Sequence, residues 1–489
     1  MSGRSTAGAG RAHPVGGRGV GQSSVAKKPN PWNRAAVARM ARELAALAAR
    51  ELVRSEGPVR APDFQRQTEA LLRRRFTPEQ IPGVVQAVAD ASLHLCHPRF
   101  MAQQVAAPLP VAALVESVVA ALNNSVAVWD MSPAATLVDR DLMRRCKRLF
   151  GYPATAEGTL VAGGSFANLT ALLAARAALV PTAWQQGGGR VAVLASEHTH
   201  YSIARAVGVM GLGTEAVFAL PTDGAFRADP LAAPAVFQAA RRAGFRRFIL
   251  VASSGCTPTG SCDDLSAFAA LARRQRAWFH VDAAHGGGFA FSRRYRRLLR
   301  GIEQADSVVF DPHKMLFMPL IAGAVLVRDG RHLRAAFAQH APYLFGGTRQ
   351  AHPNIGEFTL ACSQRFDALK MWLVWKAYGA GFWGEMVESV CAATRAAYTH
   401  CLRSEVLEPV HRPDCNIFCF RLRRPPRGRR AADRRHWELK EAVNASGAAY
   451  ISSTVLNGER VLRIVVMNPR TTADDTVAVM QQVEQLSMA

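Results

Sequence analysis

Residues 277–288 read AWFHVDAAHGGG and residues 306–318 read DSVVFDPHKMLFM, and these two stretches decide the fold of the chain. Each contains a short apolar run of strand length, followed by polar residues that can carry chemistry. Runs that are apolar at nearly every position suit strands that are buried on both faces of a sheet. Asp282 and Lys314 then stand at or just after the carboxyl end of a buried strand, where α/β proteins place their ligands.

The same pattern extends outward from these two stretches. Strands are predicted at 191–196, 245–254 and 322–329, and helices at 166–180 and 264–276 lie between some of them. This alternation predicts the α/β fold class, with a mainly parallel central sheet covered by helices.

The ends of the chain predict further units. An amphipathic stretch at 368–406, the runs NIFCFRL and VLRIVVMN, and a final helix at 472–486 indicate a smaller α+β domain. An amphipathic helix is predicted at 36–56, behind a tail rich in Gly, Ser and Arg that lacks apolar periodicity. The expected organisation is a disordered basic tail (1–35), an N-terminal helical segment (36–109), a large cofactor-binding domain (110–370) and a small C-terminal domain (371–489).

The chain carries a large positive net charge, which is concentrated in two segments. The 489 residues include 60 Lys and Arg against 37 Asp and Glu, a net charge of +23. Residues 1–35 hold six basic residues and no acidic one, and residues 421–435, a predicted loop, hold eight Arg and one Asp. We interpret the excess as a solvated basic surface and expect no nucleic-acid partner, with a basic nucleic-acid-binding protein as the alternative.

The sequence also indicates in which cellular compartment the protein is expected. No apolar run approaches the roughly 18 residues of a membrane span, and no secretory signal is evident, so no membrane association is expected. Nine cysteines, an odd number without metal-ligand spacing, predict neither a disulfide framework nor a metal site. A cytoplasmic location is the expectation.

Two further motifs join Asp282 and Lys314. Gly163-Gly164-Ser165 opens an apolar helix, whose amino terminus attracts an anion such as phosphate, although such a motif also makes ordinary turns. His200 follows the strand at 191–196, where a histidine is often only structural. Together the four motifs supply a phosphate cradle, a planar ring, a carboxylate and an amine. This is the set that an aldehyde-bearing, phosphorylated pyridine requires, with the small Ala284 leaving room for its flat ring.

At this point the chain resembles the group II pyridoxal-phosphate-dependent amino-acid decarboxylases, from about residue 90 to its end. The resemblance implies a fold-type I enzyme that uses pyridoxal 5'-phosphate and forms a homodimer, with the 36–56 helix in the dimer contact. The matching motifs are His97-Pro98-Arg99-Phe100, Gly163–Asn168, Thr199-His200-Tyr201-Ser202, His280-Val281-Asp282-Ala283-Ala284, Asp311-Pro312-His313-Lys314, Arg365–Lys370 and Asn468-Pro469-Arg470.

The resemblance also implies roles for single residues. Lys314 matches the lysine that binds the cofactor aldehyde, Asp282 the partner of the ring nitrogen, and His200 the histidine that stacks on the ring. Arg463 matches an arginine that binds the substrate α-carboxylate in some members, a role that bidentate guanidinium–carboxylate pairing explains. The phosphate is expected at Gly164, Ser165, Asn168 and His313, and Thr257 is expected near the cofactor.

Decarboxylation of an L-amino acid to the primary amine and CO2 is the reaction that the resemblance implies. Many relatives carry a proton-donating Tyr in a loop before Arg365, but residues 346–363 contain no Tyr. Decarboxylation coupled to oxidative deamination therefore stays open as an alternative. Separately, His352 in the same loop is a candidate for the substitute proton donor, with a solvent-exposed loop histidine as the other interpretation. Another fold-type I enzyme, such as an aminotransferase, is a second alternative.

The motifs conflict on the substrate. Pro353-Asn354-Ile355 and Trp129–Pro133 resemble diaminobutyrate-type members, whereas Gln103 lies where glutamate- and sulfinoalanine-type members place a substrate-contacting Gln. A diaminobutyrate-like or an acidic amino acid (aspartate, glutamate or sulfinoalanine) is expected.

Overall fold

The computed structural model describes residues 31–337, 341, 344 and 354–488. Its larger sheet has seven strands in the order β2-β8-β7-β6-β5-β3-β4. Neighbouring strands are parallel except where β8 is involved, because β8 runs antiparallel to both β7 and β2. The sheet is therefore mainly parallel, as predicted. Its strands are β2 (Glu157–Val161), β3 (Val191–Ser196), β4 (Val217–Leu220), β5 (Arg247–Ser253), β6 (Trp278–Asp282), β7 (Ser307–Phe310) and β8 (Gly323–Val327).

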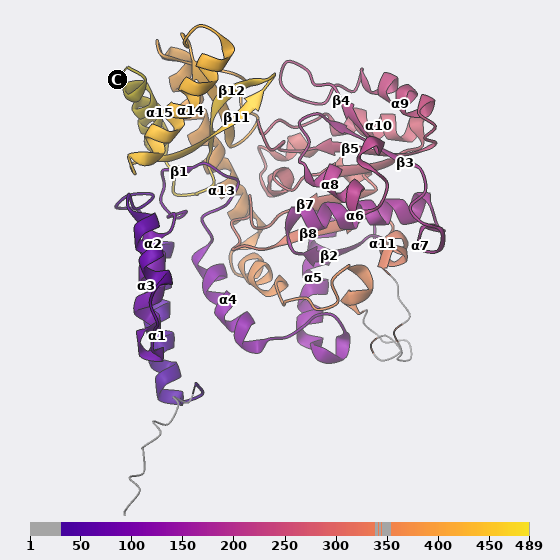
Figure 1. The fold of residues 1–489 in the computed structure, drawn as a ribbon. Coiled ribbons are helices and arrows are strands. Elements are labelled where there is room, and N and C mark those ends of the chain that lie inside the picture. Colours follow the sequence, from indigo (N-terminus) through magenta and orange to yellow (C-terminus); the bar gives the residue numbers. More distant parts are fainter. Residues whose placement is uncertain (1–30, 338–340, 342–343, 345–353, 489) are drawn as a thin grey trace, which may run out of the picture.

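Helices cover both faces of this sheet (Figure 1). Side chains alternate between the faces of a strand, and on β5 Phe248 and Leu250 join one apolar cluster while Ile249 and Val251 join the other. The first cluster includes residues of α5 (Pro133–Leu149), α9 (Ala233–Arg242) and α10 (Leu265–Gln275). The second includes residues of α6 (Gly163–Leu179), α7 (Ala183–Gln186), α8 (Ser202–Val209) and α11 (Gly330–Phe337).

Local sequence explains why these elements start and stop where they do. At α10, the Asp264 side chain accepts a hydrogen bond from the Ala267 N–H at 3.0 Å, which caps the helix. Buried residues recur on one face of the helix, as at Leu265, Phe268 and Ala272, and the helix ends before Arg276 in a left-handed conformation. The five predicted strands of this sheet lie within two residues of observed strands, but β2 and β4 were not predicted.

A second sheet of five strands has the order β1-β11-β12-β10-β9. It is antiparallel except for β1, which comes from the N-terminal part of the chain and pairs with β11 in parallel. The elements of this region are β1 (Phe100–Met101), β9 (Leu407–Pro409), β10 (Ile417–Leu422), β11 (Tyr450–Leu456), β12 (Glu459–Val465), α13 (Ala368–Arg403), which is interrupted at Gly379, α14 (Arg429–Ala445) and α15 (Ala473–Met488).

The N-terminal helices stand beside the body of the molecule (Figure 1). They are α1 (Arg34–Leu52), α2 (Phe64–Leu72), α3 (Ile81–Ala91) and α4 (Pro110–Leu122). The Asn33 side chain accepts from the Ala36 N–H at 3.0 Å and caps α1, so the helix begins two residues before the predicted start. In the described ranges, no helix is long and apolar enough to cross a membrane.

The Arg-rich stretch 421–435 is the predicted loop only in its middle, residues 423–428. Arg421 belongs to β10, and residues from Arg429 onward form the first turns of α14. Arg421 pairs with Glu408 at 2.7 Å and with Glu459 at 2.9 Å, so acidic residues elsewhere in the sequence balance part of its charge. For residues 429–435 the prediction was wrong because clustered arginines mask the helical period of this segment.

Candidate active site

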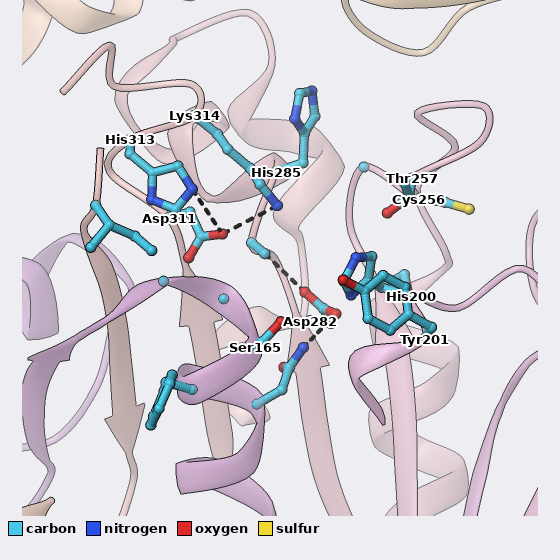
Figure 2. Close-up of a pocket in the computed structure, with 18 of the residues that line it drawn as sticks. Ser165, His200, Tyr201, Cys256, Thr257, Asp282, His285, Asp311, His313 and Lys314 are labelled. Carbon is cyan, nitrogen blue, oxygen red and sulfur yellow. Dashed lines mark hydrogen bonds and ion pairs between the residues drawn. The ribbon is translucent and has the colours of Figure 1, made fainter. Parts of the chain in front are cut away.

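A cavity of about 400 Å³ opens at the carboxyl edge of the larger sheet (Figure 2). Strands β3, β5, β6 and β7 each end beside it, and the segment that follows each strand contributes residues to its wall. The amino terminus of α6 closes another side. All nine residues predicted to hold the cofactor line this cavity: Gly164, Ser165, Asn168, His200, Thr257, Asp282, Ala284, His313 and Lys314.

The amino terminus of α6 offers a place for an anion. Among the residues that the structure describes, no side chain caps this helix, so its first N–H groups have no capping partner there. Gly164 and Ser165 both line the cavity. A Cβ at Gly164 would lie 2.6 Å from Asp311 Oδ2, so only glycine permits this close approach of the helix. Free N–H groups and the helix dipole both favour a phosphate here.

Asp311 organises the amine side of the cavity. Its Oδ2 lies 3.2 Å from Lys314 Nζ and 3.7 Å from His313 Nε2, while its buried Oδ1 has no hydrogen-bond partner among the described residues. Burial raises the pKa of the Asp311 carboxyl, and the neighbouring Lys314 and His313 oppose that shift. The carboxylate thus holds the Lys314 amine at the cavity wall, as Figure 2 shows.

Asp282 lies at the end of β6 and is 7 % exposed. Its Oδ1 accepts from the Ala284 N–H at 3.0 Å, and its Oδ2 accepts from Asn168 Nδ2 at 2.9 Å. Two donors on different elements therefore fix the carboxylate, whose remaining lone pairs are available to a ligand in the cavity. Asn168 was predicted at the phosphate, but its amide contacts Asp282.

A chain of buried hydrogen bonds begins behind Asp282. The indole N–H of Trp278 can only donate, and it donates to Ser307 Oγ at 2.9 Å. At the other end of the His280 ring, Asn168 uses its amide N–H groups for Asp282 and Ser202, so its Oδ1 accepts from His280 Nε2 at 3.0 Å. In the neutral ring the proton is therefore on Nε2, and Nδ1 accepts from the Ser307 hydroxyl at 2.9 Å. Burial lowers the pKa of His280 to about 4, which keeps its ring neutral.

The chain continues from Asn168 to the wall of the cavity. Besides Asp282, Asn168 Nδ2 donates to Ser202 Oγ at 2.9 Å, and Ser202 Oγ lies 2.7 Å from His200 Nδ1. The Ser202 backbone N–H also donates to His200 Nδ1 at 3.3 Å, so Nδ1 is an acceptor and takes the proton of the Ser202 hydroxyl. In the neutral His200 ring the proton therefore resides on Nε2.

The surroundings of His200 favour the neutral ring. Burial lowers the pKa of His200, and Asp282 partly opposes this effect. The Tyr201 ring lies 4.2 Å from the His200 ring between centroids, and Arg205 Cζ lies 4.5 Å from the Tyr201 centroid. These two side chains support the His200 ring from the solvent side, since Tyr201 is 58 % exposed.

Arg463 does not line the cavity, but its neighbours approach it. It pairs with Cys419 across β12 and β10, so both side chains project from the same face of the sheet. The Cys419 thiol contacts the Pro258 carbonyl at 3.3 Å, in the turn that carries Thr257. The Arg463 side chain has no hydrogen bond or ion pair with the described residues, and its Nε is buried. Burial lowers the pKa of this guanidinium.

Other predicted residues lie elsewhere. Gln103 is exposed in the segment after β1 and does not contribute to the cavity wall. His352 lies outside the described residues.

Sequence analysis missed several residues of the wall. Tyr201, His285 and Asp311 belong to motifs that were quoted, so their neighbours signalled them, whereas nothing local marks Ile321. His285 Nε2 lies 2.7 Å from Asn416 Oδ1, and burial lowers the pKa of His285 to about 3.

The arrangement fits the cofactor that the motifs suggested. The volume falls within the roughly 300–1,000 Å³ of small-molecule sites. An uncapped helix end, an amine and a fixed carboxylate line one cavity, and these are the kinds of group that suit a phosphate, an aldehyde and a ring nitrogen. The unpartnered Asp311 Oδ1 also leaves an acceptor or donor for a bound group.

Comparison with known proteins supports this interpretation. The family described as "Pyridoxal-dependent decarboxylase conserved domain" matches residues 79–423. The chain is 33 % identical over 407 residues to L-2,4-diaminobutyrate decarboxylase from Rhizobium meliloti, covering 81 % of each chain. It is 29 % identical to acidic amino acid decarboxylase GADL1 from Xenopus tropicalis, covering 83 % of each. The crystal structure of mouse CSAD superposes with a TM-score of 0.87 at 27 % identity, covering 93 % of this chain and 99 % of the other.

Proposed function

This chain belongs to the pyridoxal-dependent decarboxylase family, and we propose that the residues of its cavity divide the work of that reaction as described below. The protein is a pyridoxal-phosphate-dependent amino-acid decarboxylase of fold-type I, a carboxy-lyase. We assign the active site to this cavity because Lys314, Asp282 and the uncapped amino terminus of α6 all line it. When bound, pyridoxal phosphate supplies the electron sink that accepts the electron pair left on the α carbon as CO2 departs.

Three groups position the cofactor in this proposal. Lys314 binds the aldehyde, and Asp311 holds the amine in place until then. Asp282 keeps the ring nitrogen protonated, with its carboxylate oriented by Asn168 and Ala284. The amino terminus of α6 receives the phosphate, with His313 beside it. Thr257 contributes to the wall, and Ala284 leaves room for the ring.

His200 moves the proton. The α carbon needs one proton after CO2 has left, and the neutral His200 ring carries its proton on Nε2. We assign His200 to the face of the cofactor ring, where this N–H serves as donor and is replenished from solvent. His352 remains a second candidate donor from the loop.

Arg463 binds the substrate α-carboxylate in this proposal. The buried Nε of Arg463 has no hydrogen-bond partner among the described residues, and a carboxylate that pairs with the guanidinium in a bidentate manner supplies one. Gln103 is exposed, and no such unsatisfied buried atom marks it. Holding the carboxylate at a fixed place also selects which bond of the α carbon lies perpendicular to the ring.

For the substrate we propose a diaminobutyrate-like or an acidic L-amino acid, because the relatives named above act on such compounds. A panel of L-amino acids scored for amine and CO2 tests this. Turnover of aromatic amino acids alone would contradict it.

A specific observation supports a second candidate reaction. Residues 346–363 contain no Tyr, whereas the family resemblance implies a proton-donating Tyr in this loop. In the alternative, the amino acid, O2 and water give the aldehyde, CO2, ammonia and hydrogen peroxide. Equal yields of amine and CO2 without peroxide support simple decarboxylation, whereas stoichiometric peroxide and ammonia support the alternative.

The cofactor assignment has its own test. The purified protein should be yellow, and borohydride should fix the cofactor to the peptide that contains Lys314. Lys314→Ala should be colourless, whereas Lys376→Ala, a control on α13, should stay yellow. An equally yellow Lys314→Ala protein would refute the assignment.

We also propose a cytoplasmic homodimer with the predicted division into tail (1–35), N-terminal segment (36–109), large domain (110–370) and small domain (371–489). Exposed apolar residues on α1–α3, including Val37, Leu72 and Val88, support a partner surface there. All nine cysteines are free, which suits a reducing compartment. A protein that light scattering shows to be a monomer and that is fully active in the assay would contradict the dimer.

A further inference from the structure

A second cavity, of about 490 Å³, lies apart from the active site. The two cavities share no lining residue. Its wall combines the segment after β6, the second half of α13, the segment before β10, and one residue from the segment after β4. These four parts of the chain bring five arginines to one hollow: Arg227, Arg294, Arg297, Arg395 and Arg412.

The positive charge of this cavity is largely unbalanced. Asp414 is the one acidic residue in its described wall, and it pairs with Arg227 through contacts of 2.7 and 3.0 Å. The other four arginines form no ion pair with the described residues. Three of the five, Arg294, Arg297 and Arg412, are exposed, yet all five line one concave space.

A further arginine of the described wall contacts a neutral partner. Arg395 Nη2 donates to the Tyr295 hydroxyl at 2.6 Å, and Arg294 Cζ lies 6.0 Å from the Tyr295 ring centroid. Burial raises the pKa of Tyr295 well above the physiological range, so this phenol stays protonated and adds no negative charge. A negative partner for the cluster must therefore come from outside the described wall.

We propose that this cavity binds a small oligophosphate, an anion with at least two linked phosphate groups. Planar guanidinium groups pair with phosphate oxygens in a bidentate manner, which a compact ammonium does not match. A single carboxylate would neutralise one arginine, whereas a chain of phosphates reaches several. The volume is also sufficient for a small molecule of this size.

The test uses the holoenzyme, so that bound cofactor already fills the phosphate cradle of the active site. Calorimetric titration with tripolyphosphate, pyrophosphate, ATP, orthophosphate and citrate compares linked phosphates with a single phosphate and with a carboxylate of similar charge. We expect one site per chain for tripolyphosphate, with an affinity at least tenfold above that for orthophosphate and citrate. The ATP arm shows whether a nucleoside is tolerated or only the inorganic chain is bound.

The variant Arg297→Ala/Arg412→Ala should weaken tripolyphosphate binding at least tenfold, because both side chains are exposed, lack ion-pair partners and line the cavity. The matched control, Arg424→Ala/Arg427→Ala, removes two exposed arginines outside the cavity and should leave the affinity unchanged. Decarboxylation and thermal unfolding of both variants should match those of the unsubstituted enzyme, which excludes misfolding as the cause.

Three results would overturn the proposal. Binding of many tripolyphosphates per chain, or equal loss in the control variant, would show attraction to the general basic surface. Equal affinity for citrate would show that the cavity does not recognise phosphate. Absence of any binding at low ionic strength, where screening is weakest, would leave the arginines as surface charges.

Discussion

Replacing Asn168 by Leu should separate the two tasks of the buried hydrogen-bond chain. Asn168 Nδ2 donates to the Asp282 carboxylate, and its Oδ1 accepts the only proton of His280 Nε2. A hydrogen bond to a charged group contributes about 1.5–3 kcal/mol, and leaving a buried donor unsatisfied costs about 1–3 kcal/mol. The free energy of unfolding should therefore fall by roughly 2.5–6 kcal/mol in total.

The same change should weaken cofactor binding. Asp282 would keep only the Ala284 N–H, so its carboxylate would no longer be held toward the ring nitrogen. If the lost 1.5–3 kcal/mol appears in binding, the dissociation constant of pyridoxal phosphate should rise about 10- to 150-fold. Urea unfolding monitored by circular dichroism measures stability, and equilibrium dialysis measures cofactor affinity.

A buried asparagine far from the active site serves as the control. Asn444 on α14 donates to the Ile451 carbonyl at 3.1 Å and accepts from the Ile451 N–H at 2.8 Å. Asn444→Leu should lose comparable stability without losing cofactor affinity. The reasoning is refuted if Asn168→Leu binds the cofactor within threefold of the unsubstituted enzyme, or if both variants lose affinity alike.

Three further predictions concern charge and pH. Arg463→Met should raise the KM for the amino acid about 10- to 150-fold while leaving thermal stability equal or higher, because the removed group includes a buried Nε without a partner among the described residues; calorimetry that shows a large loss of stability would contradict this. Burial lowers the pKa values of His280 and His285 to about 4 and about 3, so the unfolded chain binds more protons below pH 6.5. Urea unfolding should therefore show stability falling between pH 6.5 and 3, by roughly 5 kcal/mol from His285 alone, and a flat profile would argue against these buried neutral rings. Lys370 is 1 % exposed and pairs with Glu116, so Lys370→Met should lower the free energy of unfolding by about 3–5 kcal/mol. The double variant Glu116→Gln/Lys370→Met should recover part of that loss in urea unfolding.

The local pattern was sufficient for much of the fold. Apolar runs such as 191–196 and 306–311 became β3 and β7 because a strand buried on both faces needs apolar residues at every position. A loop was predicted where α14 begins, because the clustered arginine charges mask the helical period there. Strand β1 was not predicted, because two residues are too few to show a period.

Some features of the candidate site could likewise be predicted from the sequence, and others could not. Lys314, Asp282, His200 and Gly164 could be predicted because each follows a strand or opens a helix in a short motif. Gln103 could be named as a substrate contact, but not that it is exposed outside the cavity wall, since a motif shows neither exposure nor direction. Arg463 could be named, but not that its buried Nε lacks a partner among the described residues.

Only the packing of distant segments determined how these groups act on one another. Asn168 meets Asp282 across 114 positions of the chain and His280 across 112, because β6 lies between β5 and β7 and packs against α6. The same packing assembles the five arginines of the second cavity from four parts of the chain. Residue type and spacing thus specify strands, helices and reactive groups, since these depend on near neighbours. The tautomer of His200, the orientation of Asp282 and the unbalanced charge of the second cavity depend on which strands and helices become neighbours, and that is settled by burial of the apolar faces across the whole chain.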